Sequence, residues 1–350
     1  MRYQHVCVEA LAYSLPPHVV TSAEIETRLA PIYERFALPA GRLELMTGIR
    51  ERRFWDRGVL PGTISAQTAE RLLAATGFDR QQIGCLVHGS VCRDQLEPAT
   101  ASGVHHAVSL PGSALVLDVS NACLGILNGM VLAADMIELG RIRAALIVGT
   151  EMGRDLVEGT IDSLLSSPNL TKQDVKLAFA SLTIGSGSAA VLLCDRGLSK
   201  TGNRLLGGAF QADTTAHELC AGGVATQTHG DDRPRMQTDS EALLHAGVGL
   251  AQKTWDETKR TLGWTNADVQ RTFTHQVGRA HRRLLYERLE LDASLDFSTV
   301  EFLGNTGAAA LPLTAALGIE RCRVTAGDNV ALLGIGSGLN ALMLGLHWGG

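Results

Sequence analysis

The segment VSNACLGILNGMVLAADM, residues 119–136, places a single cysteine, Cys123, where a strand meets a helix. We expect the strand to end near Asp118, and the helix to begin at or near Cys123 and to end at Gly140. The free N–H groups and partial positive charge of a helix N-terminus stabilise a thiolate, lower its pKa and can hold an oxyanion formed beside the sulfur. Position alone leaves two interpretations of Cys123 open, a buried structural thiol or a nucleophile.

Three other side chains have the types that assist a cysteine nucleophile. His275 ends the segment RTFTHQ and Asn305 lies between glycines in GNTG, although a satisfied core histidine and a turn residue explain these positions equally well. His281 lies among arginines on the following helix, so we expect it on a solvated face. Glu97 precedes Pro98, where it is either a capping carboxylate at a helix start or a base whose pKa is raised beside an apolar cleft.

Other patterns are weaker. LLGIGSGLN, residues 332–340, lacks the spacing of a dinucleotide-binding loop, and a tight turn whose backbone N–H approaches a reacting oxygen fits it better. Cys85 and Cys92 point to opposite faces of an extended strand, so with His88 they predict no metal site. The order Cys, His, Asn would also suit a papain-like thiol hydrolase, but the C-G-S-C-W context of that family is missing.

The elements that must position these residues are short apolar strands that alternate with helical stretches. Strands are predicted at 82–91, 113–120, 144–151, 188–195, 271–276 and 330–338. The polar segment 194–204 separates two comparable parts, each with a strand, a reactive-looking residue at its end and then a helix. The pattern predicts an α/β fold of two similar halves, residues 1–198 and 199–350, packed face to face. The uncharged stretch 329–350 is predicted to be strand, turn and strand, not a transmembrane helix.

Composition excludes some classes of protein. The 350 residues carry a net charge of −5 and no long run of Lys or Arg, which argues against a nucleic-acid-binding surface. The N-terminal residues do not have the pattern of a secretory signal, and the seven cysteines are scattered. We therefore expect reduced thiols and a cytoplasmic protein.

Several motifs together resemble the thiolase superfamily, in particular its ketoacyl-ACP synthase III branch. They follow the order and spacing of that family over almost the whole chain: TGIRERR (47–53), NACLG (121–125), VGTE (148–151), THQ (274–276), GNTGAAALPL (304–313) and LLGIGSG (332–338). RDQLEPATAS (93–102) and NACLGILNGM make the chain most similar to the acyl-CoA condensing enzymes of bacterial long-chain olefin biosynthesis.

This resemblance implies a five-layered αβαβα sandwich built from two repeats. It implies that Cys123 accepts the acyl group, with His275 and Asn305 as its active-site partners. The backbone N–H groups of Cys123 and Ser337 would form the oxyanion hole. Glu97 would reach the active site of the neighbouring subunit of a homodimer and act there as a base. Acyl-CoA or acyl-carrier protein would be the binding partner, with no metal or further cofactor.

The resemblance leaves the second substrate open. The first hypothesis is a non-decarboxylative Claisen condensation of two acyl-CoAs to a 2-alkyl-3-oxo acid, which Glu97 supports because that reaction needs a base. The alternatives are a starter-unit ketoacyl-ACP synthase III using malonyl-carrier protein, an acyltransferase that passes the acyl group to an alcohol or amine, and a non-enzymatic binding protein. Arg42 and Met46 stand where the family commonly has an aromatic residue and an arginine that grip CoA, so the CoA-binding residues stay unassigned.

Overall fold

A computed structural model describes residues 1–224, 233–321 and 323–350. Its main sheet has nine strands in the order β11-β12-β13-β8-β1-β7-β6-β4-β5. Their bounds are β1 Val6–Ser14, β4 Ile83–Gly89, β5 Leu115–Val119, β6 Ala144–Glu151, β7 Gly187–Asp195, β8 Arg204–Ala212, β11 Arg271–Thr274, β12 Asn329–Gly336 and β13 Asn340–His347. The six strands predicted from apolar segments are therefore confirmed, with ends that differ by a few residues.

The sheet consists of two groups of strands. In the first group β4 pairs in parallel with β5 and β6, whereas β7 pairs antiparallel with β6 and β1. In the second, β11 is parallel to β12, and β13 is antiparallel to β12 and β8. A single residue pair, Cys7 with Arg204, joins β1 to β8. The predicted boundary at 198/199 falls between the two groups in the sequence, and the division into halves stays a prediction.

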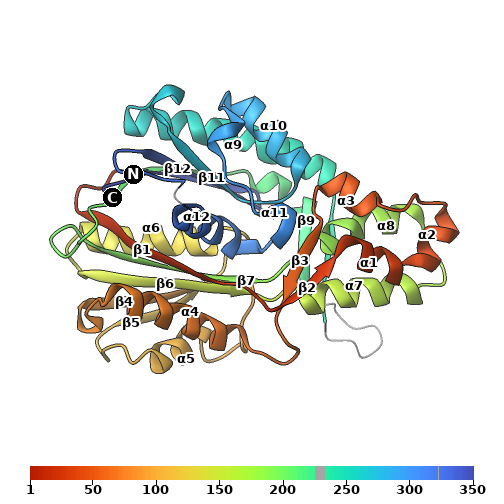
Figure 1. The fold of residues 1–350 in the computed structure, drawn as a ribbon, viewed down its shortest axis with the longest axis horizontal. Helices are drawn as coiled ribbons and strands as arrows, with labels where there is room; N and C mark the ends of the chain where they lie inside the picture. The colour runs from red at the N-terminus through yellow and green to blue at the C-terminus, as the bar shows by residue number, and fades with distance from the viewer. Residues whose placement is uncertain (225–232, 322) are drawn as a thin grey trace.

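Helices alternate with these strand groups to make five layers (Figure 1). Helices α4 (Pro61–Thr76) and α5 (Thr100–Ala107) cover one outer face. Helices α6 (Gly125–Glu138) and α12 (Ala310–Glu320) lie between the strand groups, and α9 (Ser240–Leu262) and α10 (Arg279–Leu289) cover the other outer face. The predicted α/β fold, a five-layered thiolase-like sandwich, is confirmed.

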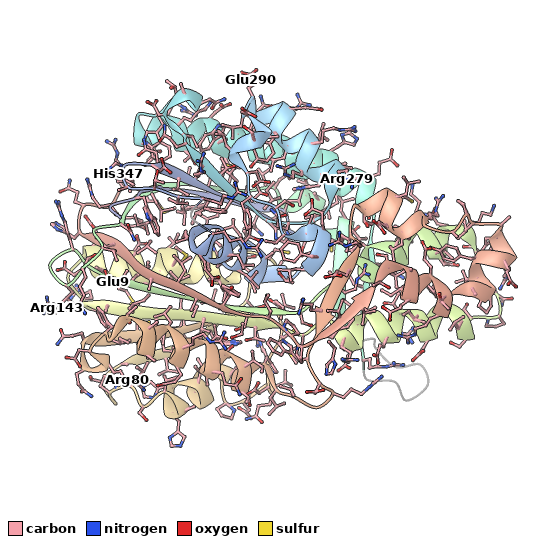
Figure 2. All side chains as sticks on the ribbon, in the orientation of Figure 1. Glu9, Arg80, Arg143, Arg279, Glu290 and His347 are labelled. Atoms are coloured by element: carbon pink, nitrogen blue, oxygen red, sulfur yellow. The ribbon has the colours of Figure 1, made fainter. Side chains whose placement is uncertain are left out.

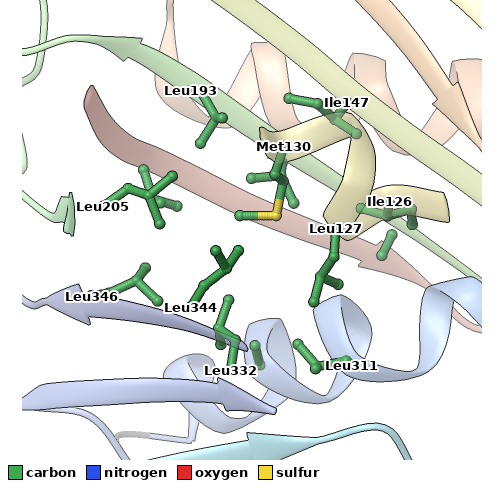
Figure 3. Close-up of a cluster of buried hydrophobic side chains, with 14 of the residues drawn as sticks. Ile126, Leu127, Met130, Ile147, Leu193, Leu205, Leu311, Leu332, Leu344 and Leu346 are labelled. Atoms are coloured by element: carbon green, nitrogen blue, oxygen red, sulfur yellow. The ribbon is translucent and has the colours of Figure 1, made fainter. Parts of the chain in front are cut away.

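The middle layer holds the largest apolar core. The buried faces of helix α6 carry four small residues, Gly125, Gly129, Ala133 and Ala134, and four bulky ones, Ile126, Leu127, Met130 and Ile137. Figure 3 shows Met130 between leucines of the two strand groups, among them Leu193 on β7 and Leu344 on β13. Most of α6 is therefore enclosed between the strand groups, although Leu132 and Asp135 are exposed.

Smaller elements extend the molecule to one side of the sandwich (Figure 1). They are β2 (His18–Thr21), β3 (Glu51–Phe54), β9 (Cys220–Val224), β10 (Pro234–Thr238), α1 (Ser22–Arg28), α2 (Ala30–Phe36), α3 (Arg42–Thr47), α7 (Arg154–Ser166), α8 (Lys172–Ala178) and α11 (Val300–Leu303). The segment from 329 onward forms the β12–β13 hairpin, as predicted. In the described ranges, no helix is long and apolar enough to cross a membrane. Six cysteines are free thiols, and Cys322 lies outside the described residues.

Candidate active site

Cys123 lies in a tight turn between β5 and α6. Ala122, immediately before it, has φ +44°, a left-handed conformation that strains a residue with a side chain. The Leu124 N–H donates to the Asn121 carbonyl at 2.9 Å and closes the turn. Helix α6 begins at Gly125, two residues later than predicted, so Cys123 precedes the helix instead of opening it.

Three glycines, Gly89, Gly125 and Gly149, allow the start of α6 to lie in close contact with strands β4 and β6. A Cβ atom on Gly125 would lie 2.9 Å from the carbonyl carbon of Gly89 at the end of β4. A Cβ atom on Gly149 in β6 would lie 2.2 Å from the carbonyl oxygen of Gly89. Real Cβ atoms do not approach backbone so closely, so hydrogen at these positions is what allows the helix to begin where it does.

The Cys123 thiol is surrounded by protein atoms, although part of the residue stays accessible to solvent. Burial raises its pKa to about 12, and the negative charges of Glu151 and Cys220 raise it further than its own backbone N–H lowers it. The expectation of a lowered thiol pKa at a helix N-terminus is therefore wrong for the free protein. Desolvation of a thiolate in this dry turn outweighs the attraction of a helix that starts two residues further on.

Glu151 is a site residue that the sequence interpretation missed. It ends β6, is only 6% exposed, and its Oε1 accepts hydrogen bonds from the Val91 N–H at 3.0 Å and the Ala308 N–H at 3.3 Å. Burial raises the pKa of this carboxyl despite those donors. The sequence signal that marks Glu151 is an acidic residue at the end of a fully buried strand, AALIVGTE.

His275 follows the last residue of β11 and is buried. Its backbone N–H donates to the Leu333 carbonyl on β12 at 3.1 Å, and among the described residues its Nδ1 has no hydrogen-bond partner. Burial, and then the charge of His281, lower its pKa to about 3, so the imidazole is neutral at physiological pH. His281 is partly buried, with its own pKa lowered to about 4 by burial, and the prediction of a solvated face for it is wrong.

Asn305 lies on a loop that is tied to the strands at several points. Its N–H donates to the Thr183 carbonyl at 2.9 Å, and its own carbonyl accepts from the Gly185 N–H at 2.8 Å. The side-chain oxygen accepts from the Gly307 N–H at 3.0 Å, which leaves the amide NH₂ as the donor end of this side chain. Two residues beyond Asn305, a Cβ on Gly307 would lie 3.0 Å from the Glu151 side chain, so this loop packs directly on Glu151.

Ser337 lies in the turn between β12 and β13, next to the nucleophile. A Cβ on the preceding residue, Gly336, would be 3.5 Å from the Cys123 backbone nitrogen. The Ser337 carbonyl accepts from Asn340 Nδ2, and the same amide donates to Asn121 in the Cys123 turn, both at 3.3 Å. Asn340 therefore joins the β12–β13 turn to the Cys123 turn. The interpretation of LLGIGSG as a tight turn near the nucleophile requires such proximity.

Glu97 is exposed in the single chain, on the loop between β4 and α5. The capping interpretation is wrong, because α5 begins at Thr100 and the Asp118 carboxylate accepts from the first two N–H groups of that helix, at 2.9 and 2.8 Å. The neighbouring Leu96 is 92% exposed, so the loop presents an apolar and an acidic side chain outward.

The structure thus gathers four segments that are distant in the sequence. The Cys123 turn, the end of β6, the Asn305 loop and the β12–β13 turn are linked by the contacts above, and His275 ends the strand beside β12. Glu97 points outward on a loop whose first residues contact Glu151. In the described part of the chain, no cluster of His, Cys, Asp or Glu is arranged to hold a metal ion.

Family models match three parts of the chain. The thiolase N-terminal domain matches residues 45–156, 3-oxoacyl-[acyl-carrier-protein] synthase III matches residues 117–214, and the C-terminal part of that synthase matches residues 260–348. With the five layers and the Cys123 turn between β5 and α6, they define a condensing enzyme of the thiolase superfamily, in the synthase III branch.

Full-length relatives narrow this class. The chain is 41% identical to the acyl-CoA:acyl-CoA alkyltransferase of Shewanella oneidensis, across 99% of this chain and 100% of the relative, and 35% identical to that of Xanthomonas campestris. The crystal structure of cerulenin-bound Xanthomonas OleA matches with a TM-score of 0.93 at 35% identity, covering 99% of this chain and 98% of the other. A β-ketoacyl-ACP synthase III from Koribacter versatilis is 23% identical. The chain belongs to the acyl-CoA:acyl-CoA alkyltransferase family.

Proposed function

We propose that this enzyme joins two fatty acyl-CoA molecules by non-decarboxylative Claisen condensation to a 2-alkyl-3-oxo acid. The observation that carries the proposal is the identity to the Shewanella alkyltransferase, which extends over the full length of both chains. Solved variants of Xanthomonas OleA alter a cysteine, a glutamate and a histidine. These are the residue types proposed here for Cys123, Glu97 and His275.

The first step transfers an acyl group to Cys123. Near pH 7 the thiol, with a pKa of about 12, and the His275 imidazole, with a pKa of about 3, are both neutral, so no ion pair is stored in the free enzyme. The proton therefore leaves Sγ as the sulfur attacks the thioester carbonyl, and it passes to the departing CoA sulfur, which leaves as a thiol. The N–H groups of Cys123 and Ser337 stabilise the oxyanion of this step.

The second step forms the carbon–carbon bond. Glu97 of the partner subunit removes a proton from C2 of a second acyl-CoA, and His275 with the Asn305 amide stabilises the enolate oxygen. The enolate carbon attacks the Cys123 thioester, and the sulfur departs and regains a proton. Water then cleaves the remaining CoA thioester to give the 3-oxo acid. The thioesters supply the electrophile and Glu97 the base, so the reaction needs no metal or redox cofactor.

A homodimer is part of this proposal. Strand β5 is an edge of the main sheet, and Leu115 on it is half exposed, as is Val91 at the start of the Glu97 loop. An unpaired edge with exposed apolar side chains favours a protein partner. A second copy covering this surface would also take Glu97 out of water, which a proton-abstracting carboxylate needs. We place the enzyme in the cytoplasm, where CoA thioesters are available.

The deciding experiment incubates the enzyme with myristoyl-CoA, with and without malonyl-carrier protein, and identifies products by mass spectrometry. A 3-oxo acid formed without malonyl groups is expected. A product that appears only with malonyl-carrier protein would instead establish the starter-unit synthase. Acyl transfer to an added alcohol or amine without any carbon–carbon bond would establish the acyltransferase.

Two variants assign the residues. Cys123→Ala is expected to abolish the acyl-enzyme seen by intact mass, whereas Glu97→Ala should acylate and then stall. Mixing the two inactive variants should restore about a quarter of wild-type activity if subunits exchange at random and Glu97 acts across the dimer. Exchange demonstrated by native mass spectrometry without any recovery of activity would show that Glu97 does not serve the partner's site.

A further inference from the structure

The carboxyl group of Glu151 accepts hydrogen bonds from two loops of the site and acts electrostatically on a third segment. It ends β6, where it pairs with Gly187 of β7, so its backbone belongs to the rigid sheet. Its side chain lies between the Glu97 loop, which begins beside Val91, and the Asn305 loop, where Ala308 donates to it. The third segment is the Cys123 turn, where the charge of Glu151 raises the pKa of the Cys123 thiol.

We propose that Glu151 is a positioning residue that fastens the Glu97 loop and the Asn305 loop to the end of β6, and that its ionisation suppresses the reactivity of Cys123. The proposal rests on the proposed role of Cys123 as the nucleophile. It adds a second titrating group, on a rigid strand, to the residues that carry the reaction.

The positioning part follows from the hydrogen bonds. Both donors are backbone N–H groups that would be left unsatisfied in a buried place without the carboxyl oxygen. The contact with Gly307 leaves no room for the Asn305 loop to settle closer, and it leaves a void if the side chain is removed. Glu151 therefore sets how far both loops lie from the nucleophile.

The electrostatic part follows from the buried neighbours of the carboxyl. The Cys92 thiol and the Ser90 hydroxyl lie against it from the loop after β4, and its charge raises the pKa of the Cys123 thiol in the turn before α6. Asp155 at the start of α7 acts on the Cys92 thiol, and Cys220 on β9 acts on the Cys123 thiol. Each of these groups is a thiol, a hydroxyl or a carboxyl, so none of them supplies a positive charge to an ionised Glu151, which then opposes a thiolate at Cys123.

The test measures alkylation of Cys123 by iodoacetamide from about pH 6 to about pH 10, with peptide mass mapping to distinguish it from the other thiols. Glu151→Gln keeps an acceptor oxygen for both N–H groups but cannot ionise. The ratio of its alkylation rate to that of the wild type should rise with pH as Glu151 ionises in the wild type, and should reach about tenfold at alkaline pH. Glu151→Ala should also lose the acceptor, and its condensation rate should fall at least about tenfold below that of Glu151→Gln.

Glu9→Gln is the matched control, because Glu9 is also a glutamate with 6% exposure held by hydrogen bonds. It lies at the other end of the sheet, near the chain termini (Figure 2), and should leave the alkylation profile unchanged. A Glu151→Gln profile parallel to the wild type at every pH would refute the electrostatic part. Condensation at equal rates in Glu151→Gln and Glu151→Ala would refute the positioning part.

These results remain interpretable if the proposed function fails. Alkylation reports the thiol itself and needs neither acyl-CoA nor turnover, so a profile that diverges at alkaline pH establishes the Glu151–Cys123 coupling whatever the substrate. If Cys123 is not the acylated residue, a separate experiment will show it, because an acyl adduct will persist in Cys123→Ala. The thermal midpoint of each variant shows whether it is folded. If Glu151→Ala is misfolded, Glu151→Asp is tested in its place.

Discussion

Gly125→Ala tests whether the position of the nucleophile depends on the close approach of α6 to the strands. Gly125 is the first residue of α6, two residues after Cys123. The added methyl group would meet three backbone atoms, the Gly89 carbonyl carbon at 2.9 Å, the Ser90 nitrogen at 3.1 Å and the Gly89 oxygen at 3.2 Å. The backbone at the end of β4, a strand paired on both sides, cannot rotate away as a side chain could, so the helix start has to move.

The size of the effect follows from these distances. Relieving the shortest contact from 2.9 Å to an ordinary 3.4 Å needs a shift of 0.5 Å. Overpacking of this kind costs about 1–3 kcal/mol, and the higher helix propensity of alanine returns at most about 1 kcal/mol. Since a misplacement of about 1 Å costs roughly 100-fold in rate, half of it should slow acylation of Cys123 by about tenfold.

The assay follows acyl-enzyme formation from myristoyl-CoA by rapid quench and intact mass, together with the thermal midpoint. Gly103→Ala is the matched control, because Gly103 lies inside helix α5 and a Cβ there would meet nothing within 4 Å. That variant should be more stable than the wild type by about 1 kcal/mol and should acylate at the wild-type rate. If Gly125→Ala is as stable and as fast as Gly103→Ala, the close approach of α6 does not determine the geometry of the nucleophile.

Two further predictions concern stability. Asp118→Ala removes the acceptor for two N–H groups at the start of α5 and should lower the free energy of unfolding by about 1 kcal/mol, with Asp118→Asn recovering part of it; an unchanged denaturation midpoint would contradict this. His275 has its pKa lowered from 6.5 to about 3, so below pH 6.5 the unfolded chain takes up a proton that the folded protein refuses. Stability is therefore unaffected by this group above pH 6.5 and falls as the pH drops towards 3, by up to about 1.4 kcal/mol per pH unit. Urea titrations at about pH 7 and about pH 5 should show a smaller fall in the free energy of unfolding for His275→Gln than for the wild type. An equal fall in the two proteins would refute the burial argument.

Much of the local structure could be predicted from the sequence. Apolar runs such as AALIVGTE identify buried strands because a strand covered on both faces needs no alternation of polar residues. The strand, turn and helix around Cys123 were recognisable because glycine at 140 and apolar periodicity mark a helix. The residue types at 123, 275 and 305 belong to the printed chain and need no fold to be noticed.

The tertiary structure decided what surrounds those residues. The thiol pKa of Cys123 depends on burial and on Glu151, which is 28 positions away along the chain, and local sequence pointed in the opposite direction. His281 is partly buried although its neighbours on α10 are arginines, and it acts electrostatically on His275. Hydrophobic patterns report which residues avoid water, but they do not report which buried polar groups will meet.

Glu151 illustrates the limit most clearly. The sequence alone determined that an acidic residue ends a buried strand, and the topology decided that Val91 and Ala308 would donate to it from loops some 60 and 157 positions away. Pairing of β4 with β6 brings the Glu97 loop to the end of β6, and hydrogen bonds of Asn305 with Thr183 and Gly185, just before β7, bring the Asn305 loop there. Contacts of this kind arise from the order of strands and the packing of layers, and no local pattern of residues encodes them.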